Sequence, residues 1–283
     1  MREIMLSVLV TKADGTKQYF DKNKVVRTCM RMGASRDAAE AVASKIEDML
    51  YPGIETKKIL QMIFRYMRTH RPATRHQIDL RRALSLLAPA PDFEVYVQML
   101  LREHGYHVQP NTLLRGMCVE HEVDGIATRD GRTCFVEVKH HYLYHTQTNL
   151  DVSRIARAVF EDVTEGYAAG VNDTKIDYAM IVCNTKLTDP AKRYADCRGI
   201  RSIGWSSPKD GDLQTLIETR KLYPVTYLRG LNSVARQRLT ADGIILLKQF
   251  IETDKNRLRK LTGFSGQKLE SMLEYARAIF SGV

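Results

Sequence analysis

Two acids and a lysine that flank a tight turn are the residues of this chain whose types and spacing best support chemistry. Asp130-Gly131 separates two runs of alternating apolar and polar residues, a pattern that predicts a β-hairpin. Counting back from the turn places Asp124 opposite Glu137 on one face of the hairpin. Opposed carboxylates repel each other, and a divalent cation such as Mg²⁺ would offset the repulsion. The spacing therefore predicts a metal site.

The lysine, Lys139, falls on the same face by the same count. Its plainest role is an ion pair with Glu122, which the count places directly opposite. Its other role is catalytic, because its amine would lie beside the metal. The count also places Arg129 opposite Arg132, next to the turn.

A third acid, Glu94, belongs to a helix that we predict over residues 92–104, before Gly105. Phe93, Val97 and Leu101 lie on the apolar stripe of this helix, and Glu94 borders that stripe. A carboxylate in such a place either lies in solvent at the edge of the apolar stripe or is a third acid directed at the metal.

The overall charge favours a polyanionic partner. The chain has 283 residues, with 43 Lys and Arg against 33 Asp and Glu, a formal charge of +10 and a pI near 9.4. Nucleic acid is the leading candidate, and a basic protein that binds no nucleic acid is the alternative.

The cysteines and the hydropathy indicate a compartment. The five cysteines include no C-x-x-C pair, so neither a disulfide framework nor a zinc ribbon is indicated, and we expect small buried thiols in a reducing environment. The N-terminal apolar run is too short for a signal peptide, and we expect no membrane-spanning segment. The cytoplasm is the expected location.

The chain divides into three regions by the periodicity of its apolar residues and by its turn signals. Residues 1–88 read as a hairpin with an Asp14-Gly15 turn followed by helices, and end at a proline-rich segment. Residues 91–225 alternate helices and strands, which predicts an α/β domain with a mixed sheet. Residues 228–283 read as a small all-α domain. The expected fold class is multidomain α/β.

The middle region resembles a known family of nucleases. Glu94, Asp124 and Glu137-Val138-Lys139, in the order helix, strand, strand, are similar to the PD-(D/E)xK superfamily in its restriction-endonuclease-like branch. The resemblance spans roughly residues 92–225. It implies that Asp124, Glu137 and the Val138 carbonyl hold Mg²⁺ or Mn²⁺, that Lys139 orients or deprotonates the attacking water, and that Glu94 belongs to the catalytic set.

Further residues of this region have two readings each. Arg154 and Arg157 lie one turn apart on the helix predicted after the hairpin. Either they bind the scissile phosphate, or they belong to the solvent-exposed face of that helix. The histidine-rich run 140–145 has no H-E-x-x-H motif and no cysteine partner, so we expect no four-ligand zinc site there.

The opening region resembles the ATP-cone, a small regulatory nucleotide-binding domain. The motifs V-T-K-A-D-G, F-D-x-x-K-V and Y-P-G-I-x-T carry the resemblance between Val8 and about Leu87. It implies binding of a nucleoside triphosphate, ATP or dATP, and assembly into a homo-oligomer. The residues aligned with nucleotide contacts are Val10, Lys12, Lys24, Val25 and Thr56. Ala13 stands where the family often has arginine, and a helical domain without a ligand is the alternative.

The last region resembles a helix-hairpin-helix. Gly263 and Gly266 bracket the turn between two helical patterns, and Lys260 and Lys268 flank it. Such a turn offers backbone N–H groups to a DNA phosphate. The alternative is an ordinary corner between helices, because glycine commonly ends a helix.

These observations together predict a Mg²⁺-dependent DNA endonuclease regulated by ATP or dATP. A nucleotide-responsive regulator that binds DNA without cutting it is the alternative from another functional class, and RNA is an alternative substrate.

Overall fold

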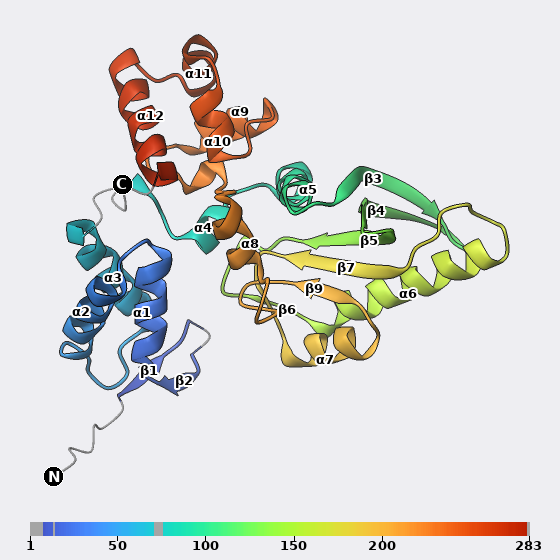
Figure 1. Cartoon of the computed structure of the whole chain (residues 1–283), viewed down its shortest axis with the longest axis horizontal. Coiled ribbons are helices and arrows are strands. Elements are labelled where there is room, and N and C mark those ends of the chain that lie inside the picture. Colours follow the sequence, from blue (N-terminus) through green and yellow to red (C-terminus); the bar gives the residue numbers. More distant parts are fainter. Residues whose placement is uncertain (1–7, 14, 71–75, 282–283) are drawn as a thin grey trace. The chain divides into compact units, whose positions relative to one another are not determined.

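The computed structural model describes residues 8–13, 15–70 and 76–281, which divide into two compact units (Figure 1). The first unit consists of residues up to 78, residues 228–230 and residues from 266 onward. The second unit consists of residues 79–227 and 231–265. The three domains expected from the sequence, 1–88, 91–225 and 228–283, stay a prediction.

The first unit combines a short antiparallel strand pair with helices. The strands are β1 (Leu9–Thr11) and β2 (Lys17–Tyr19), and the predicted turn residue Asp14 lies outside the described residues. The helices are α1 (Lys22–Arg31), α2 (Arg36–Glu47), α3 (Thr56–His70) and α12 (Gly266–Ser281). Asp21 and Ser35 accept hydrogen bonds from the first turns of α1 and α2, as the sequence predicts.

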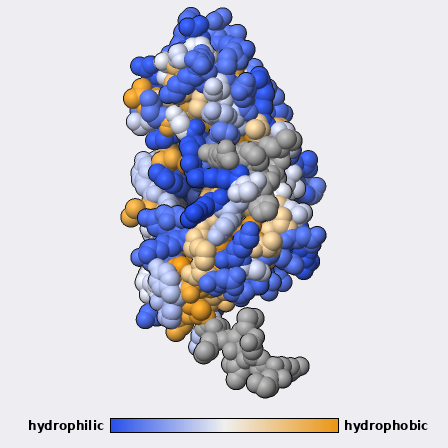
Figure 2. Space-filling model, turned by 90° about the vertical axis from the view of Figure 1, so that its left-hand side faces the viewer, coloured by the Kyte–Doolittle hydropathy of each residue, from blue (hydrophilic) through white to orange (hydrophobic). Residues whose placement is uncertain are grey.

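The first unit has its own hydrophobic core and also exposes apolar side chains. Val10, Cys29, Ile46 and Ile63 belong to one buried cluster. Figure 2 shows apolar side chains in orange beside charged ones on the face that carries this unit. The large apolar side chains exposed in this unit include Leu9, Tyr19, Met30, Met49 and Tyr51.

The second unit is built around a five-stranded mixed sheet in the order β3-β4-β5-β7-β9. Its strands are β3 (His107–Arg115), β4 (Glu120–Arg129), β5 (Arg132–Lys139), β7 (Tyr178–Cys183) and β9 (Arg201–Ile203). The first two pairings are antiparallel and the last two are parallel, so the predicted mixed sheet is confirmed. A separate parallel pair joins β6 (Gln147–Thr148) to β8 (Lys186–Leu187).

Helices cover both faces of this sheet (Figure 1). α6 (Leu150–Ala168) and α7 (Asp189–Cys197) lie on one side, where Ala156 and Val163 pack with Val123 and Phe135. α5 (Glu94–Glu103) lies on the other side and follows the turn of π-helix η2 (Pro89–Phe93).

Short helices complete the second unit. They are α4 (Leu80–Ser85), α8 (Leu213–Arg220), the 3₁₀ turn η3 (Val225–Tyr227), α9 (Ser233–Ala241), α10 (Leu247–Glu252) and α11 (Lys255–Thr262). The region after residue 228 is helical, as predicted.

The strand β3 and the helix α7 of the second unit were not expected from the sequence. β3 contains Pro110 and exposed polar residues, which an edge strand tolerates because one side of it carries no partner strand. α7 contains Pro190, which reads as a helix breaker but occupies the first turn, where its missing N–H costs no hydrogen bond.

The cysteine prediction is correct in part. All five thiols are free, and Cys29, Cys134 and Cys183 are buried, but Cys118 and Cys197 are exposed. The cytoplasmic location stays a prediction. Among the described residues, no helix combines the length and apolar character that crossing a membrane requires.

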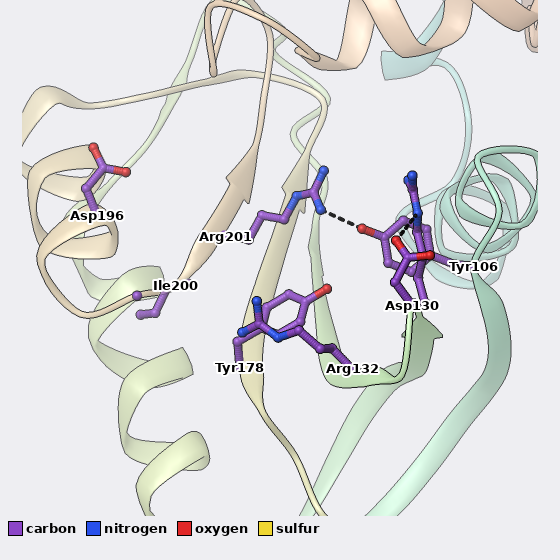
Figure 3. Close-up of a pocket in the computed structure, with 9 residues that line it drawn as sticks. Tyr106, Asp130, Arg132, Tyr178, Asp196, Ile200 and Arg201 are labelled. Atoms are coloured by element: carbon purple, nitrogen blue, oxygen red, sulfur yellow. Dashed lines mark hydrogen bonds and ion pairs between the residues drawn. The ribbon is translucent and has the colours of Figure 1, made fainter.

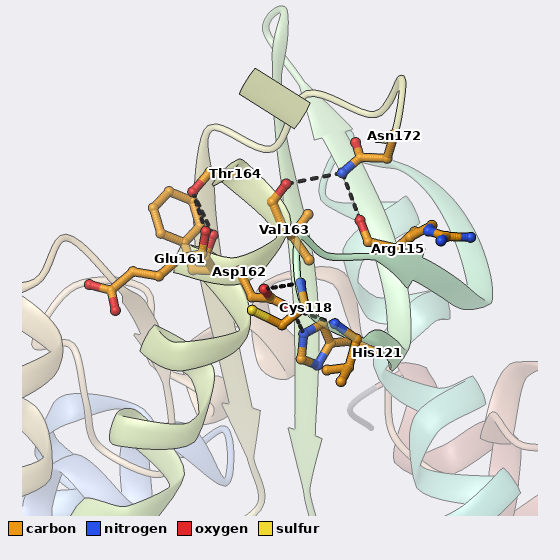
Figure 4. A network of polar contacts seen from close by, with 10 residues as sticks. Arg115, Cys118, His121, Glu161, Asp162, Val163, Thr164 and Asn172 are labelled. Carbon is orange, nitrogen blue, oxygen red and sulfur yellow. Dashed lines mark hydrogen bonds and ion pairs between the residues drawn. The ribbon is translucent and has the colours of Figure 1, made fainter. Parts of the chain in front are cut away.

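The tip between β3 and β4 is fastened to α6 by Asp162 (Figure 4). The Asp162 carboxylate accepts the Cys118 N–H at 2.7 Å and the His121 Nε2–H at 2.7 Å. The hydrogen bond from His121 lowers the pKa of Asp162 to about 2. The contact is so close that a Cβ atom on Gly116 would lie 1.9 Å from Asp162 Oδ2.

Replacement of Gly166 by alanine should destabilise this packing. A helical glycine normally costs about 0.5–1 kcal/mol relative to alanine, but a Cβ on Gly166 would lie 2.8 Å from Gly116 C and 2.9 Å from Met117 N. We expect Gly166→Ala to lower the free energy of unfolding by about 1–3 kcal/mol, measured by urea denaturation. Glu165→Ala, at the exposed neighbouring position, is the control. A Gly166→Ala protein as stable as the parent would contradict the packing.

Candidate active site

The β4–β5 hairpin has the register that the sequence predicts. Arg129 pairs with Arg132, and the ladder continues to Gly125 opposite Val136. Beyond that pair, a side-chain oxygen is the hydrogen-bond acceptor in place of a backbone carbonyl: Asp124 Oδ2 accepts the Val138 N–H at 2.6 Å. Asp124 and Glu137 therefore lie side by side where the ladder ends.

The β3–β4 ladder also lacks a regular pair at Asp124. Pro110 pairs with Gly125 and Thr112 with Val123, so Asn111 and Asp124 are not a regular pair. Asn111 has φ 27°, in the left-handed region that asparagine enters more readily than most residues. A backbone distortion next to a carboxylate is typical of functional sites.

A buried glutamine of α5 fills this gap in the ladder. Gln98 is 5% exposed, and its Nε2 donates to the Asp124 carbonyl at 3.1 Å and to Asn111 Oδ1 at 3.2 Å. Asn111 Nδ2 donates to Glu94 Oε2 at 3.4 Å. The chain of contacts thus links Glu94, in the first turn of α5, to Asp124.

Sequence analysis missed Gln98 and Asn111. One signal was present for Gln98, because a glutamine one turn after Glu94, next to the apolar Val97, is a polar residue on a face that must be buried. The sequence gives no comparable signal for Asn111, whose role depends on the local distortion of β3.

Burial and neighbouring acids make the charge of Asp124 costly. Burial, the largest cause, raises its pKa to about 6, and the carboxylates of Glu137 and Glu94 add to the rise. The Val138 N–H and Lys139 act in the opposite direction. A divalent cation at this place would reverse the balance.

The predicted partner of Lys139 is wrong. Lys139 Nζ contacts Glu137 Oε1 at 2.5 Å rather than Glu122, which is exposed on β4. Strand alternation keeps Glu137 and Lys139 on one face, two residues apart, and the end of the ladder leaves Glu137 accessible to the amine. The amine therefore lies next to one of the two predicted metal ligands.

The side chains alone do not form a complete metal site. Among the described residues, no group of three or more His, Cys, Asp or Glu is arranged to hold an ion. Mg²⁺ usually takes one or two carboxylates and keeps several waters. Asp124, Glu137 and the Val138 carbonyl fit that modest requirement, and burial, with smaller contributions from Glu137 and Glu94, raises the pKa of Asp124.

The histidines after Lys139 hold the backbone. His140 Nε2 bonds the Leu84 carbonyl at 3.1 Å, and His141 Nε2 bonds Thr148 Oγ1 at 3.1 Å. The His141 N–H donates to Asn184 Oδ1 at 2.9 Å. Burial lowers the pKa of both imidazoles. Each of these two imidazoles thus has one ring nitrogen in a hydrogen bond within the protein.

Arg154 and Arg157 both lie on α6. Among the described residues, no hydrogen bond or ion pair joins either arginine to Asp124 or Glu137. Arg154 pairs with Asp151 at 3.6 Å and Arg157 with Glu161 at 2.7 Å, each on its own helix. Their contact with a scissile phosphate stays a prediction.

The predicted nucleotide-binding residues of the first unit have different exposures. Val10 and Val25 are 2% and 3% exposed and belong to the core, so their side chains do not face a ligand. Lys12 and Lys24 are exposed, and Thr56 begins α3. The Thr11 N–H donates to the Ile54 carbonyl at 2.9 Å, which joins β1 to the segment before Thr56.

The predicted DNA-binding turn near the C-terminus contains a helix terminator. Gly263 ends α11 in the left-handed conformation with φ 68°, and α12 begins at Gly266. This is the local geometry of the alternative reading, in which glycine simply ends a helix. Lys260 and Lys268 are exposed.

A known protein family matches the part of the chain that contains the candidate active site. A restriction endonuclease family matches residues 88–203, and a family described as AF1548-like, C-terminal, matches residues 223–280. An uncharacterized protein of Archaeoglobus fulgidus is 32% identical over 181 residues, which are 64% of this chain and 97% of that protein. Another uncharacterized protein of the same organism is 47% identical over 38 residues, 13% of this chain and 81% of that protein.

A solved structure is also similar. The crystal structure of a protein of unknown function, AF1548, matches with a TM-score of 0.55 and 30% identity. The match covers 67% of this chain and 97% of that one. All four predicted catalytic residues lie within the restriction endonuclease match at 88–203.

Replacement of Asp124 by asparagine should stabilise the metal-free protein. The folded pKa near 6 lies above the value of about 4 in an unfolded chain, so the charged form weakens folding above pH 6 and this penalty fades toward pH 4. Asparagine removes the charge and can still accept the Val138 N–H. We expect Asp124→Asn to add about 1 kcal/mol to the free energy of unfolding at pH 7.5 in EDTA, and to add little at pH 4.

The matched control is Asp130→Asn, at a carboxylate with 84% exposure. It should leave the stability unchanged at either pH. If Asp124→Asn is as destabilising at pH 7.5 as at pH 4, the carboxylate is not under electrostatic strain.

Proposed function

The chain belongs to the AF1548-like family and carries a restriction-endonuclease-like domain, and from this membership we propose that it is a Mg²⁺-dependent DNA endonuclease. Mn²⁺ is the alternative ion. The single observation that supports the chemistry most is the adjacency of Asp124, Glu137 and Lys139 where the hairpin ladder ends. The formal charge of +10 supports a polyanionic substrate.

Each residue of the site has a proposed role. Asp124, Glu137 and the Val138 carbonyl would hold the cation, and the cation would supply a bound water of lowered pKa and neutralise charge on the phosphoryl oxygens. Lys139, whose amine forms an ion pair with Glu137 Oε1, would orient the attacking water. Gln98 fixes the Asp124 backbone, and Glu94 acts through Asn111 as a further acid of the site.

A regulator that binds DNA without cutting it is the second candidate. One observation favours it: Lys139 neutralises Glu137 in an ion pair of 2.5 Å. Cleavage assays separate the two functions.

We also propose that the first unit binds ATP or dATP and so regulates the enzyme. The support is the sequence resemblance to the ATP-cone, together with two exposed lysines, Lys12 and Lys24. An ammonium group is a strong point charge for phosphate. The exposed apolar side chains of this unit are consistent with the proposed homo-oligomer, because such residues mark interaction surfaces.

Lys260, Lys268 and the turn between Gly263 and Gly266 are proposed to contact the DNA backbone. Such contacts would position the duplex without reading its sequence. Arg154 and Arg157 keep a proposed role at phosphates, for which each would have to leave its acidic partner on α6.

Nicking of supercoiled plasmid DNA tests the enzyme proposal. We expect the protein to cut with Mg²⁺ or Mn²⁺, and Asp124→Asn, Glu137→Gln and Lys139→Ala each to lower the rate at least about 100-fold, because the metal contributes several kcal/mol to stabilising the transition state. Glu122→Gln, at the exposed acid of the same hairpin, is the control and should cut like the parent. Binding of DNA without cutting under every metal and nucleotide would favour the regulator, and preferred cutting of a structured RNA would change the substrate.

Calorimetric titration tests the nucleotide site. We expect ATP or dATP to bind the parent, and Lys12→Ala and Lys24→Ala each to weaken binding roughly tenfold, the effect of losing one hydrogen bond to a charged group. Lys45→Ala, an exposed lysine of α2 outside the predicted set, should bind like the parent. Equal losses in all three variants, or no binding by the parent, would contradict the site.

A further inference from the structure

A cavity of about 610 Å³ lies at the end of the sheet where β5, β7 and β9 begin (Figure 3). We call it the arginine pocket. Its lining includes Tyr106, Arg129, Arg132, Tyr178, Asp196 and Arg201. Glu137 is five residues further along β5 than Arg132, a span of about 17 Å at the usual rise per strand residue. The arginine pocket is therefore separate from the candidate active site.

Two tyrosines hold the three guanidinium groups. Arg201 Nη1 donates to Tyr106 Oη at 2.5 Å, and both Arg201 and Arg129 lie over the Tyr106 ring, at 5.9 and 5.4 Å from its centroid. Arg132 lies over the Tyr178 ring at 5.0 Å. Tyr106 is only 5% exposed and therefore fixed. Stacking of this kind orders the guanidinium groups before a ligand arrives.

Positive charge is concentrated in the pocket beyond what its acids neutralise. Arg129 and Arg132 are directly paired across the hairpin, where like charges destabilise a sheet. Arg129 contacts Asp130 at 3.2 Å, but within the described residues no carboxylate lies within ion-pair distance of Arg132 or Arg201. Arg132 also helps to lower the pKa of Asp177, mainly held low by the Thr133 N–H, so one acid lies near it without a direct contact. An anion in the cavity would relieve this repulsion.

We propose that the arginine pocket binds the phosphomonoester of a nucleotide. Planar guanidinium forks match phosphate oxygens in a bidentate manner. The two arginines without an acid in contact suit a dianionic terminal phosphate better than a singly charged diester. The volume of about 610 Å³ lies within the usual range of small-molecule pockets and leaves room for a nucleoside beside the phosphate.

The phosphomonoester has two possible sources, a free mononucleotide or the 5′-phosphate at the end of a DNA strand. Both present the same dianionic group to the pocket. The proposal does not rest on DNA cleavage, since it needs neither a metal nor the acids of β4 and β5.

Binding in EDTA tests the proposal without involving the proposed metal-dependent reaction. The probes are dAMP against deoxyadenosine, by calorimetry, and a hairpin oligonucleotide with a 5′-phosphate against one with a 5′-hydroxyl, by fluorescence anisotropy. All measurements use Lys12→Ala/Lys24→Ala protein, which lacks the lysines of the proposed nucleotide site. We expect the phosphorylated probe to bind more tightly in at least one pair, and Arg132→Ala and Arg201→Ala each to weaken it at least about tenfold.

Arg193→Ala is the matched control, since it removes one exposed arginine of α7 outside the pocket and should leave binding unchanged. Arg132→Lys keeps the charge, loses the fork and should weaken binding even if Arg132→Ala fails to fold. A preference for dAMP alone identifies a free nucleotide as the source, and a preference for the 5′-phosphorylated oligonucleotide alone identifies a DNA end. Equal binding of both members of each pair, or losses as large in Arg193→Ala as in the pocket variants, would overturn the proposal.

Discussion

The site depends on one interaction, the hydrogen bond from the Val138 N–H to the side chain of Asp124. This bond occupies a donor that the hairpin ladder would otherwise use, so regular pairing stops at Gly125 and Val136. It also holds the Asp124 carboxylate close to Glu137, a separation that two like charges resist. Folding energy from the buried strands on either side must offset that repulsion. The close approach of the two carboxylates costs local stability, a trade common at functional sites.

The rest of the unit keeps this arrangement rigid. Gln98 Nε2 donates to the Asp124 carbonyl, so the break in the β3–β4 ladder does not leave that acceptor without a partner. α5, which carries Gln98, is itself fixed by Tyr96, a fully buried side chain whose hydroxyl donates to the Leu222 carbonyl at 2.8 Å. On the other face Asp162 fastens the β3–β4 tip to α6. Each polar group near Asp124 thus has a structural reason for its position.

Features set by residues close together in the sequence could be predicted, and contacts between residues far apart in the sequence could not. The hairpin register followed from Asp130-Gly131, since turn chemistry is local, and the caps Asp21 and Ser35 followed for the same reason. The Glu122–Lys139 pair was wrong because the count assumed a ladder that continues past Asp124. The arginine pocket was out of reach, because Arg201 and Tyr106 meet across 95 residues and only the folded sheet brings them together.

Helix α4, at the start of the second unit, is bonded to the residue that follows Lys139. The chain passes from the first unit to the second between Ile78 and Asp79 and enters α4 at once. In α4 the Leu84 carbonyl bonds His140, the residue after Lys139, and Arg81 lies over the ring of Trp205 at 5.5 Å while donating to the Tyr144 carbonyl. The side chain of His140 therefore links α4 to the segment that directly follows β5.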